Sequence, residues 1–164
     1  MVNQENIYQN IIKLLNDSSA EHRLFEHPAA LTYDDLEAVQ KEAGFFGTEG
    51  KCMVIKADNK FIVYVTTFGK EINFNLIKEK LNVNKISLAS PEELKKYFGA
   101  EPGCAYPFGF NESFDIFIDP GIYNVEWFLF SPLYPTKTIQ VKGLDLKKVF
   151  ENSGNNIEQI SFNL

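Results

Sequence analysis

The chain has 164 residues, of which 45% are hydrophobic and 23% are charged, values ordinary for a globular protein with one core. Its formal net charge of −6 argues against a broad nucleic-acid-binding surface, because binding many phosphates requires clustered lysine and arginine. That charge is compatible with a small pocket that takes only the end of an RNA strand. No apolar run approaches the roughly 18–20 residues that span a bilayer, so we expect no membrane partner.

The first residues and the cysteines indicate the cellular compartment. The first nine residues contain Asn, Gln and Glu but no basic residue followed by an apolar stretch, which argues against a secretory signal. Cys52 and Cys104 are the only cysteines, too few for a disulfide framework and without the CxxC spacing of a zinc site. We therefore expect a cytoplasmic protein with reduced thiols and no bound metal.

Apolar spacing and turn signals predict helices and strands that alternate without a regular βαβ rhythm. Two helix starts are marked by capping pairs, Thr32 with Asp35 and Ser90 with Glu93. The predicted order is a helix over about 4–17, a strand over 23–26, a helix ending near 43, strands over 52–56 and 61–67, a helix over 73–81, a strand over 86–89, a helix from 90 to about 98, strands over 114–118, 125–130 and 138–141, a helix over 144–150 and a strand over 157–162.

These elements predict a single α+β domain over residues 1–164, with a mostly antiparallel mixed sheet flanked by helices. The domain core is expected from about residue 20 to 164, preceded by the N-terminal helix. Phe occurs 15 times, so the core should be rich in aromatic side chains. Two glycines and a proline within residues 103–109 predict a bent loop whose backbone groups could face a ligand, although an ordinary tight turn is the commoner case.

Few side chains stand out as candidates for chemistry. Lys51 opens a β-rich run after a glycine-rich connection, where a lysine could bind a phosphate or a developing oxyanion; a solvated surface lysine is the alternative. His22 and His27 are the only histidines, and a structural role is the commoner one for each. Cys104 is a candidate nucleophile, but a buried filler is more usual without a neighbouring histidine. Neither a GxSxG elbow nor a phosphate-binding glycine motif is present.

Several segments, in order along the chain, together resemble the motifs of one family. They are Phe25–Thr32, which resembles "EHPA...T", Lys51 at the start of a hairpin, Lys85–Leu94, which resembles "K-R-L-S-F-A-S-P-E-E-L", Glu101–Gly109, which resembles "E-P-G-x-x-x-P-F-G", and Phe130–Thr138, which resembles "F-H-P-L-x-x-T-x-T". The family that these segments resemble is the YbaK-like superfamily, which includes the insertion domain of bacterial prolyl-tRNA synthetase and free-standing relatives that clear Ala or Cys from prolyl-tRNA. The match runs from about residue 20 to the end and is nearest to the ProXp-ala/PrdX-like branch.

The resemblance implies a YbaK/ProRS editing-domain-like α+β fold and a trans-editing deacylase that hydrolyses the ester of mischarged aminoacyl-tRNA. The amino acid would be small, such as Ala or Cys on tRNA for proline. The implied partners are the 3′ end of aminoacyl-tRNA and prolyl-tRNA synthetase, with no DNA, no metal and no cofactor. The implied catalytic positions are Lys51, Gly103 and Pro107, and the implied substrate-binding positions are His27, Thr32, Cys52, Cys104, Ala105, Tyr106, Phe108, Gly109 and Ser131.

Three positions depart from the family pattern. Cys52 stands where the alanine-clearing branch often has Asn, Ser131 replaces the His of "F-H-P-L", and Tyr106 holds a position that is commonly Ser or Thr. These departures put the alanine preference in question. Two alternatives therefore stay open: a non-catalytic module that binds aminoacyl-tRNA or a synthetase, and a pocket that senses a free amino acid.

Overall fold

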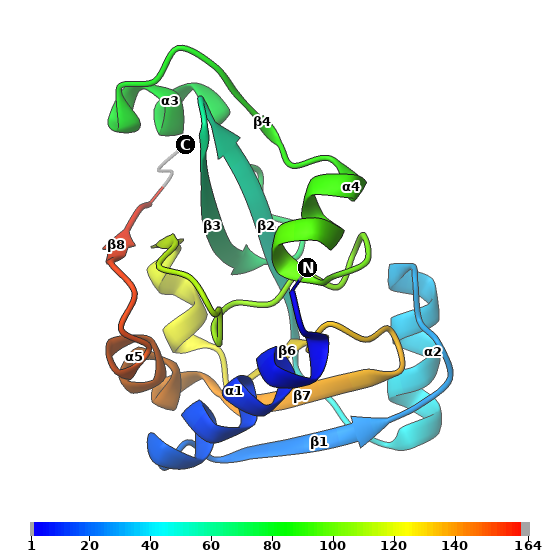
Figure 1. Cartoon of the computed structure of the whole chain (residues 1–164). Helices are drawn as coiled ribbons and strands as arrows, with labels where there is room; N and C mark the ends of the chain where they lie inside the picture. Colours follow the sequence, from blue (N-terminus) through cyan, green and yellow to red (C-terminus); the bar gives the residue numbers. More distant parts are fainter. Residues whose placement is uncertain (1, 162–164) are drawn as a thin grey trace.

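The structure is a computed structural model that describes residues 2–161. Helices and strands alternate along the chain, and Figure 1 shows their arrangement. The helical elements are α1 (Gln4–Asp17), α2 (Tyr33–Ala43), α3 (Phe74–Leu81), α4 (Pro91–Glu93), the π-helical turn η1 (Leu94–Phe98), the 3-10 helix η2 (Pro120–Asn124) and α5 (Gly143–Asn152). The strands are β1 (His22–Glu26), β2 (Thr48–Ala57), β3 (Lys60–Thr67), β4 (Ile86–Leu88), β5 (Asp115–Ile118), β6 (Trp127–Phe130), β7 (Lys137–Lys142) and β8 (Ile157–Gln159).

Within the described residues, the strands form one mixed sheet in the order β1-β7-β6-β2-β3-β5-β8, and β4 pairs separately with β2. Pairings β1–β7, β6–β7, β2–β3 and β2–β4 are antiparallel, whereas β2–β6, β3–β5 and β5–β8 are parallel. Strand β2 joins the two halves: its first residues, Thr48 and Glu49, pair with β6, and its remainder pairs with β3. The predicted α+β class, with a mixed sheet flanked by helices, is confirmed.

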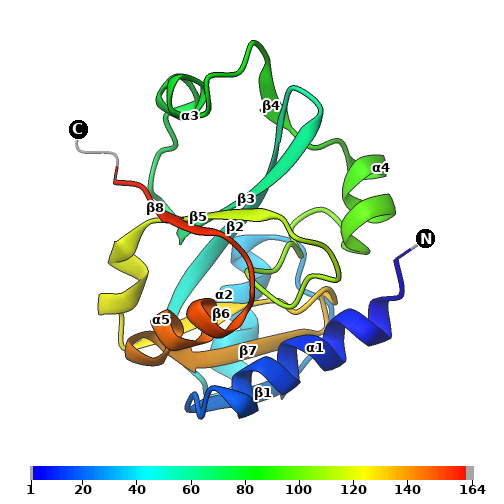
Figure 2. The same cartoon turned by 60° about the vertical axis from the view of Figure 1, so that its left-hand side comes forward.

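The N-terminal helix belongs to the main core. Asn3 caps α1 by accepting a hydrogen bond from the backbone N–H of Asn6. Ile7, Ile11 and Leu15 follow one another at four-residue spacing and are almost fully buried. Figures 1 and 2 both show α1 lying along β7 and β1. The helix over residues 4–17, predicted from this apolar spacing, is confirmed.

Aromatic rings fill much of the interior, as the composition predicts. The ring of Phe108 meets those of Phe130 and Phe150 edge to face, with centroids 5.4 and 5.6 Å apart. Among the described residues, the almost fully buried phenylalanines include Phe98, Phe108, Phe117, Phe128, Phe130 and Phe150.

Several element boundaries differ from the prediction. Strand β2 begins at Thr48 rather than Cys52, because its first residues pair with the distant strand β6. Strand β6 begins at Trp127 rather than Val125, because η2 occupies the preceding residues. The last strand ends at Gln159, and residue 162 of the predicted strand lies outside the described residues. Among residues 2–161, no helix is long and apolar enough to cross a membrane.

Candidate functional site

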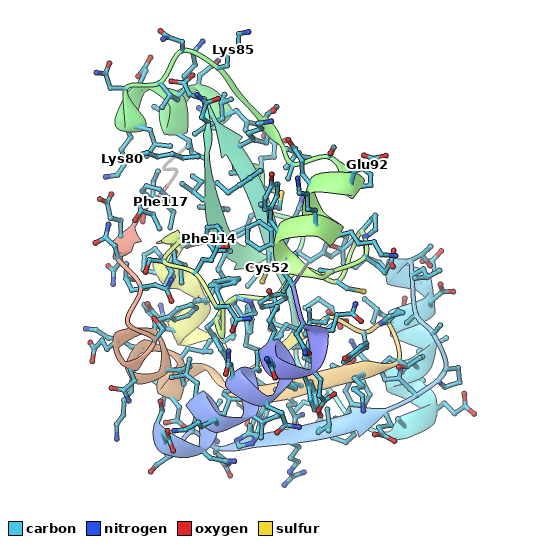
Figure 3. All side chains as sticks on the ribbon, viewed as in Figure 1. Cys52, Lys80, Lys85, Glu92, Phe114 and Phe117 are labelled. Atoms are coloured by element: carbon cyan, nitrogen blue, oxygen red, sulfur yellow. The ribbon has the colours of Figure 1, made fainter. Side chains whose placement is uncertain are left out.

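A cavity of about 260 Å³ opens where the first half of β2 faces the N-terminus of α2 and the loop that follows η1. Figure 3 labels Cys52, which lies near the middle of the molecule on β2. The lining residues come from four separate chain segments, so the cavity exists only in the folded chain. They are Ala30, Leu31, Thr32, Tyr33, Leu36, Glu49, Gly50, Lys51, Cys52, Met53, Gly103, Ala105, Phe130 and Ser131.

Lys51 is the one basic side chain in this lining. Strand β2 holds it in register opposite Thr66 of β3 and leaves it partly buried. Within the part of the chain that the structure describes, its ammonium has no ion-pair or hydrogen-bond partner, unlike lysines such as Lys56, which pairs with Glu93. An unpaired cation in a concave pocket is available for an anionic or carbonyl group of a ligand.

The loop after η1 turns its backbone toward the cavity. Gly103 adopts a φ of +85°, which L side chains rarely adopt, and a Cβ added there would meet nothing within 4 Å. The turn is closed by the Cys104 N–H, which donates to the Glu101 carbonyl at 3.0 Å. Gly103 and Ala105 therefore line the cavity while Cys104 is buried behind them. This geometry leaves main-chain groups of the loop accessible in the cavity that Lys51 also lines.

The N-terminus of α2 forms the opposite wall. Thr32 caps the helix: its hydroxyl accepts from the Asp35 N–H, and the Asp35 carboxylate accepts from the Thr32 N–H, each at 3.1 Å. This capping box confirms the predicted pair. Next to it, the ring of Tyr33 stacks on Phe68, with centroids 3.5 Å apart, and the two side chains stay 41% and 51% exposed. The wall thus offers an accessible aromatic surface at the mouth of the cavity.

Glu49 is a site residue that sequence reasoning missed. It is the one acidic side chain in the lining, and its Oε1 accepts a hydrogen bond of 2.8 Å from Nε2 of Gln40 on α2. Burial raises the pKa of its carboxyl to about 7, although the Gln40 hydrogen bond acts in the opposite direction. Burial, and then the Glu49 charge, also raise the pKa of Tyr33. No sequence pattern marks this glutamate, because its burial depends on α2 folding over β2.

The raised pKa of Glu49 predicts a pH-dependent stability. The folded chain keeps the proton up to about pH 7, whereas the unfolded chain loses it near the ordinary 4.5, so stability falls as pH rises between these values. Each pH unit contributes about 1.4 kcal/mol, less a discount for the open cavity. The free energy of unfolding of Glu49→Gln relative to wild type should therefore increase by about 2 kcal/mol from pH 5 to pH 8. Urea unfolding of both proteins at pH 5 and pH 8 measures this change. The exposed Glu42→Gln is the control, and a gap independent of pH would contradict the assignment.

Other predicted site residues lie outside the lining. His27 is held by two contacts of 2.8 Å: Nδ1 donates to the Pro28 carbonyl, and Nε2 meets the Thr138 hydroxyl. The Tyr106 hydroxyl donates to the Phe98 carbonyl at 2.8 Å, with its ring buried. The remaining predicted site residues, Pro107, Phe108 and Gly109, are all buried. A Cβ added at Gly109 would lie 2.6 Å from Cγ1 of Ile11. These residues shape the loop from within the core.

The two cysteines have distinct places. Cys52 lines the cavity, and burial raises the pKa of its thiol strongly. Cys104 lies behind the loop, where burial raises the pKa of its thiol to about 11. Both thiols are therefore protonated near neutral pH, which disfavours either as a nucleophile. Among residues 2–161, no group of three or more His, Cys, Asp or Glu side chains is placed to hold a metal ion.

A wider groove of about 890 Å³ lies at the turn of the β2–β3 hairpin, with Asn59, Tyr97 and Phe114 among its lining residues. Figure 3 labels Phe114, one of these lining residues. None of the site residues predicted from sequence lines this groove. The smaller cavity is therefore the candidate site.

Comparisons with known proteins bear on this cavity. The model of a family described as the aminoacyl-tRNA editing domain matches residues 27–149. Proline–tRNA ligase of Bacillus velezensis is 32% identical over 104 residues, which cover 59% of this chain and 18% of the ligase. That of Caldicellulosiruptor bescii is 30% identical over 89 residues, covering 52% of this chain and 15% of the ligase. The chain thus spans less than a fifth of the length of these relatives.

A solved structure shares the fold. The crystal structure of a candidate trans-editing enzyme for prolyl tRNA synthetase superposes with a TM-score of 0.72 at 14% identity, covering 96% of this chain and 98% of that one. The segment matched by the family model contains both walls of the cavity, from α2 through Lys51 and Gly103 to Ser131. Because the model covers most of the sequence, the chain belongs to the aminoacyl-tRNA editing domain family.

Proposed function

We propose that the chain is a trans-editing deacylase that hydrolyses the ester of mischarged aminoacyl-tRNA, with a small amino acid such as alanine or cysteine on tRNA for proline. We further propose that residues 1–164 act as one editing domain in the cytoplasm. One observation carries the proposal: in a chain of the editing-domain family, an unpaired lysine and an exposed glycine backbone line the same small cavity.

The chemistry requires few protein groups. Hydrolysis adds water to the acyl carbon, breaks the acyl–oxygen bond and returns the ribose oxygen to the tRNA as a hydroxyl. Negative charge builds on the carbonyl oxygen in the transition state, and the Lys51 ammonium would stabilise it there more than in the ground state. Backbone groups of Gly103 and Ala105 would orient the ester and the water. A free ribose hydroxyl of the substrate would assist proton transfer, so no protein base is required.

The aromatic pair at the mouth supports binding of a nucleotide. The stacked rings of Tyr33 and Phe68 are half-exposed, and Tyr33 also lines the cavity. Unpaired bases at the end of an RNA strand stack readily on such rings. We place the terminal adenine of tRNA on this pair, with its ribose leading into the cavity. Such a contact involves few phosphates, which agrees with the net charge of −6.

The size of the cavity supports a small aminoacyl group. Its volume of about 260 Å³ lies below the roughly 300–1,000 Å³ typical of pockets for drug-sized ligands. Leu31, Leu36 and Met53 give it an apolar wall for a short side chain. Editing of small residues is needed because a synthetase discriminates one methylene by only about 1–3 kcal/mol. The ligases that the chain resembles act on proline, which supports tRNA for proline as the carrier.

A deacylation panel tests the proposal. The purified chain is mixed with tRNA for proline charged with alanine, cysteine, serine, threonine or proline, and the acylated fraction is followed over time. We expect one of the small amino acids to be released well above the buffer rate, with prolyl-tRNA left intact. Binding to these tRNAs without release of any amino acid would instead identify a non-catalytic binding module. Heat of binding with free amino acids alone would identify a sensor.

A further inference from the structure

The carboxylate of Glu49 has one oxygen committed and one available. Oε1 accepts from Gln40 Nε2 at 2.8 Å, and within residues 2–161 no hydrogen bond or ion pair reaches Oε2. Glu49 is partly buried and is the one acidic residue in the lining of the cavity. Gln40 therefore fixes the carboxylate and leaves its second oxygen for a ligand.

Lys51 lies two residues further along β2, on the same side of the strand. The rise of a strand places two such positions about 6.6 Å apart. Glu49 and Lys51 both line the cavity, yet they form no ion pair with each other. A negative and a positive group held side by side without contact suit a ligand that carries a cation close to an electron-rich oxygen. An aminoacyl ester has this arrangement, since its α-ammonium is attached to the carbon next to the carbonyl.

We propose that Glu49 binds the α-ammonium group of the aminoacyl ester and so makes the cavity specific for aminoacyl over other acyl groups. The inference rests on the proposed function, because it assumes that the ester is hydrolysed in this cavity. With the ammonium on Oε2, the carbonyl oxygen is directed toward Lys51. Glu49 is then a binding residue that determines specificity, and it leaves the proton transfers to the water and the ribose hydroxyl.

The electrostatics of the cavity support this role. A partly buried carboxylate without a cation is unfavourable, which is why burial raises the pKa of Glu49. An incoming ammonium would restore its charge through a charge-assisted hydrogen bond. A site built to bind an N–H group rejects analogues that lack it by large factors, because its own polar group is then left unpaired. Glu49 gives the cavity such a group.

The test compares two esters that differ only at the α position, alanyl-tRNA and lactyl-tRNA, in which a hydroxyl replaces the ammonium. Seryl-tRNA and glyceryl-tRNA replace them if serine is the faster substrate in the panel. For wild type, we expect kcat/KM for the aminoacyl ester to exceed that for the hydroxyacyl ester at least about tenfold. Glu49→Gln should reduce the rate with the aminoacyl ester at least about tenfold and leave the hydroxyacyl ester within twofold.

Two further variants separate charge from fold. Glu42→Gln removes the same charge at an exposed position of α2 outside the cavity and should behave as wild type. Glu49→Asp keeps a carboxylate and should recover part of the preference for the ammonium. Equal slowing of both esters in Glu49→Gln would overturn the inference and indicate a general structural or base role. Hydrolysis of neither ester by wild type would instead remove the proposed function, and the inference with it.

Discussion

Replacement of Lys51 by alanine is expected to lower kcat/KM for deacylation at least about 100-fold, the effect typical of losing one oxyanion-stabilising donor. The free energy of unfolding should change by less than about 0.5 kcal/mol, because the side chain forms no ion pair or hydrogen bond among the described residues. The loss should appear in kcat more than in KM if the ammonium acts on the transition state. Initial rates of release from the best panel substrate measure both constants.

The controls separate a specific role from a change of charge. Lys85→Ala removes a lysine at an exposed position outside the cavity lining, which Figure 3 shows far from Cys52, and should keep wild-type rates. Lys51→Arg keeps the charge but enlarges the head group, so it should recover only part of the activity. Full activity in Lys51→Ala would exclude the lysine from catalysis and leave the backbone of the Gly103 loop to act alone.

Replacement of Gly50 by alanine is expected to destabilise the fold by about 3 kcal/mol, at the upper end of overpacking effects. A Cβ at this position would lie 2.2 Å from Cζ of Phe128, whose ring is fully buried. Either that ring must move or β2 must separate from β6. The melting temperature should fall by about 6–12 °C, and deacylation should fall with it because Glu49 and Lys51 flank the substitution.

A matched glycine and a second-site change sharpen this test. Gly69→Ala has open space around its Cβ but a φ of +92°, so only backbone strain of about 1–2 kcal/mol is expected. Phe128→Leu should destabilise wild type, yet in the Gly50→Ala background it should cost less, because it relieves the clash. Thermal and urea unfolding of wild type, Gly50→Ala, Phe128→Leu and the double variant gives the interaction energy between the two positions. Equal stability of Gly50→Ala and Gly69→Ala would show that the Phe128 ring moves away from the added Cβ at little cost in stability.

Features that depend on neighbouring residues were predictable from sequence. Helix α1 spans residues 4–17 as its apolar spacing predicts. Both capping boxes form as expected, at Thr32 with Asp35 and at Ser90 with Glu93. These contacts involve residues three or four apart, so the local sequence specifies them without help from the rest of the fold.

The site was predictable only in part. Lys51, Gly103, Thr32, Cys52, Ala105 and Ser131 do line one cavity, which is the arrangement that the family resemblance implies. The resemblance did not indicate side-chain direction. Tyr106 and Phe108 turn into the core beside loop residues that face the cavity. Packing of the loop against α1 and η1 decides which of its residues are buried: Gly109 lies against Ile11, and the Tyr106 hydroxyl donates to the Phe98 carbonyl.

Sequence alone therefore determined the α+β class, the order of the helices and strands apart from the 3-10 helix η2, their local caps and the family to which the chain belongs. The tertiary structure alone decided the parallel pairing of β2 with β6, the close approach of Phe128 to Gly50, and the burial of Glu49 under Gln40. Each of these contacts except the last joins residues far apart in the chain. Even Gln40 and Glu49 meet only after α2 folds back over β2, so burial and charge at the site arise from long-range packing that no local pattern encodes.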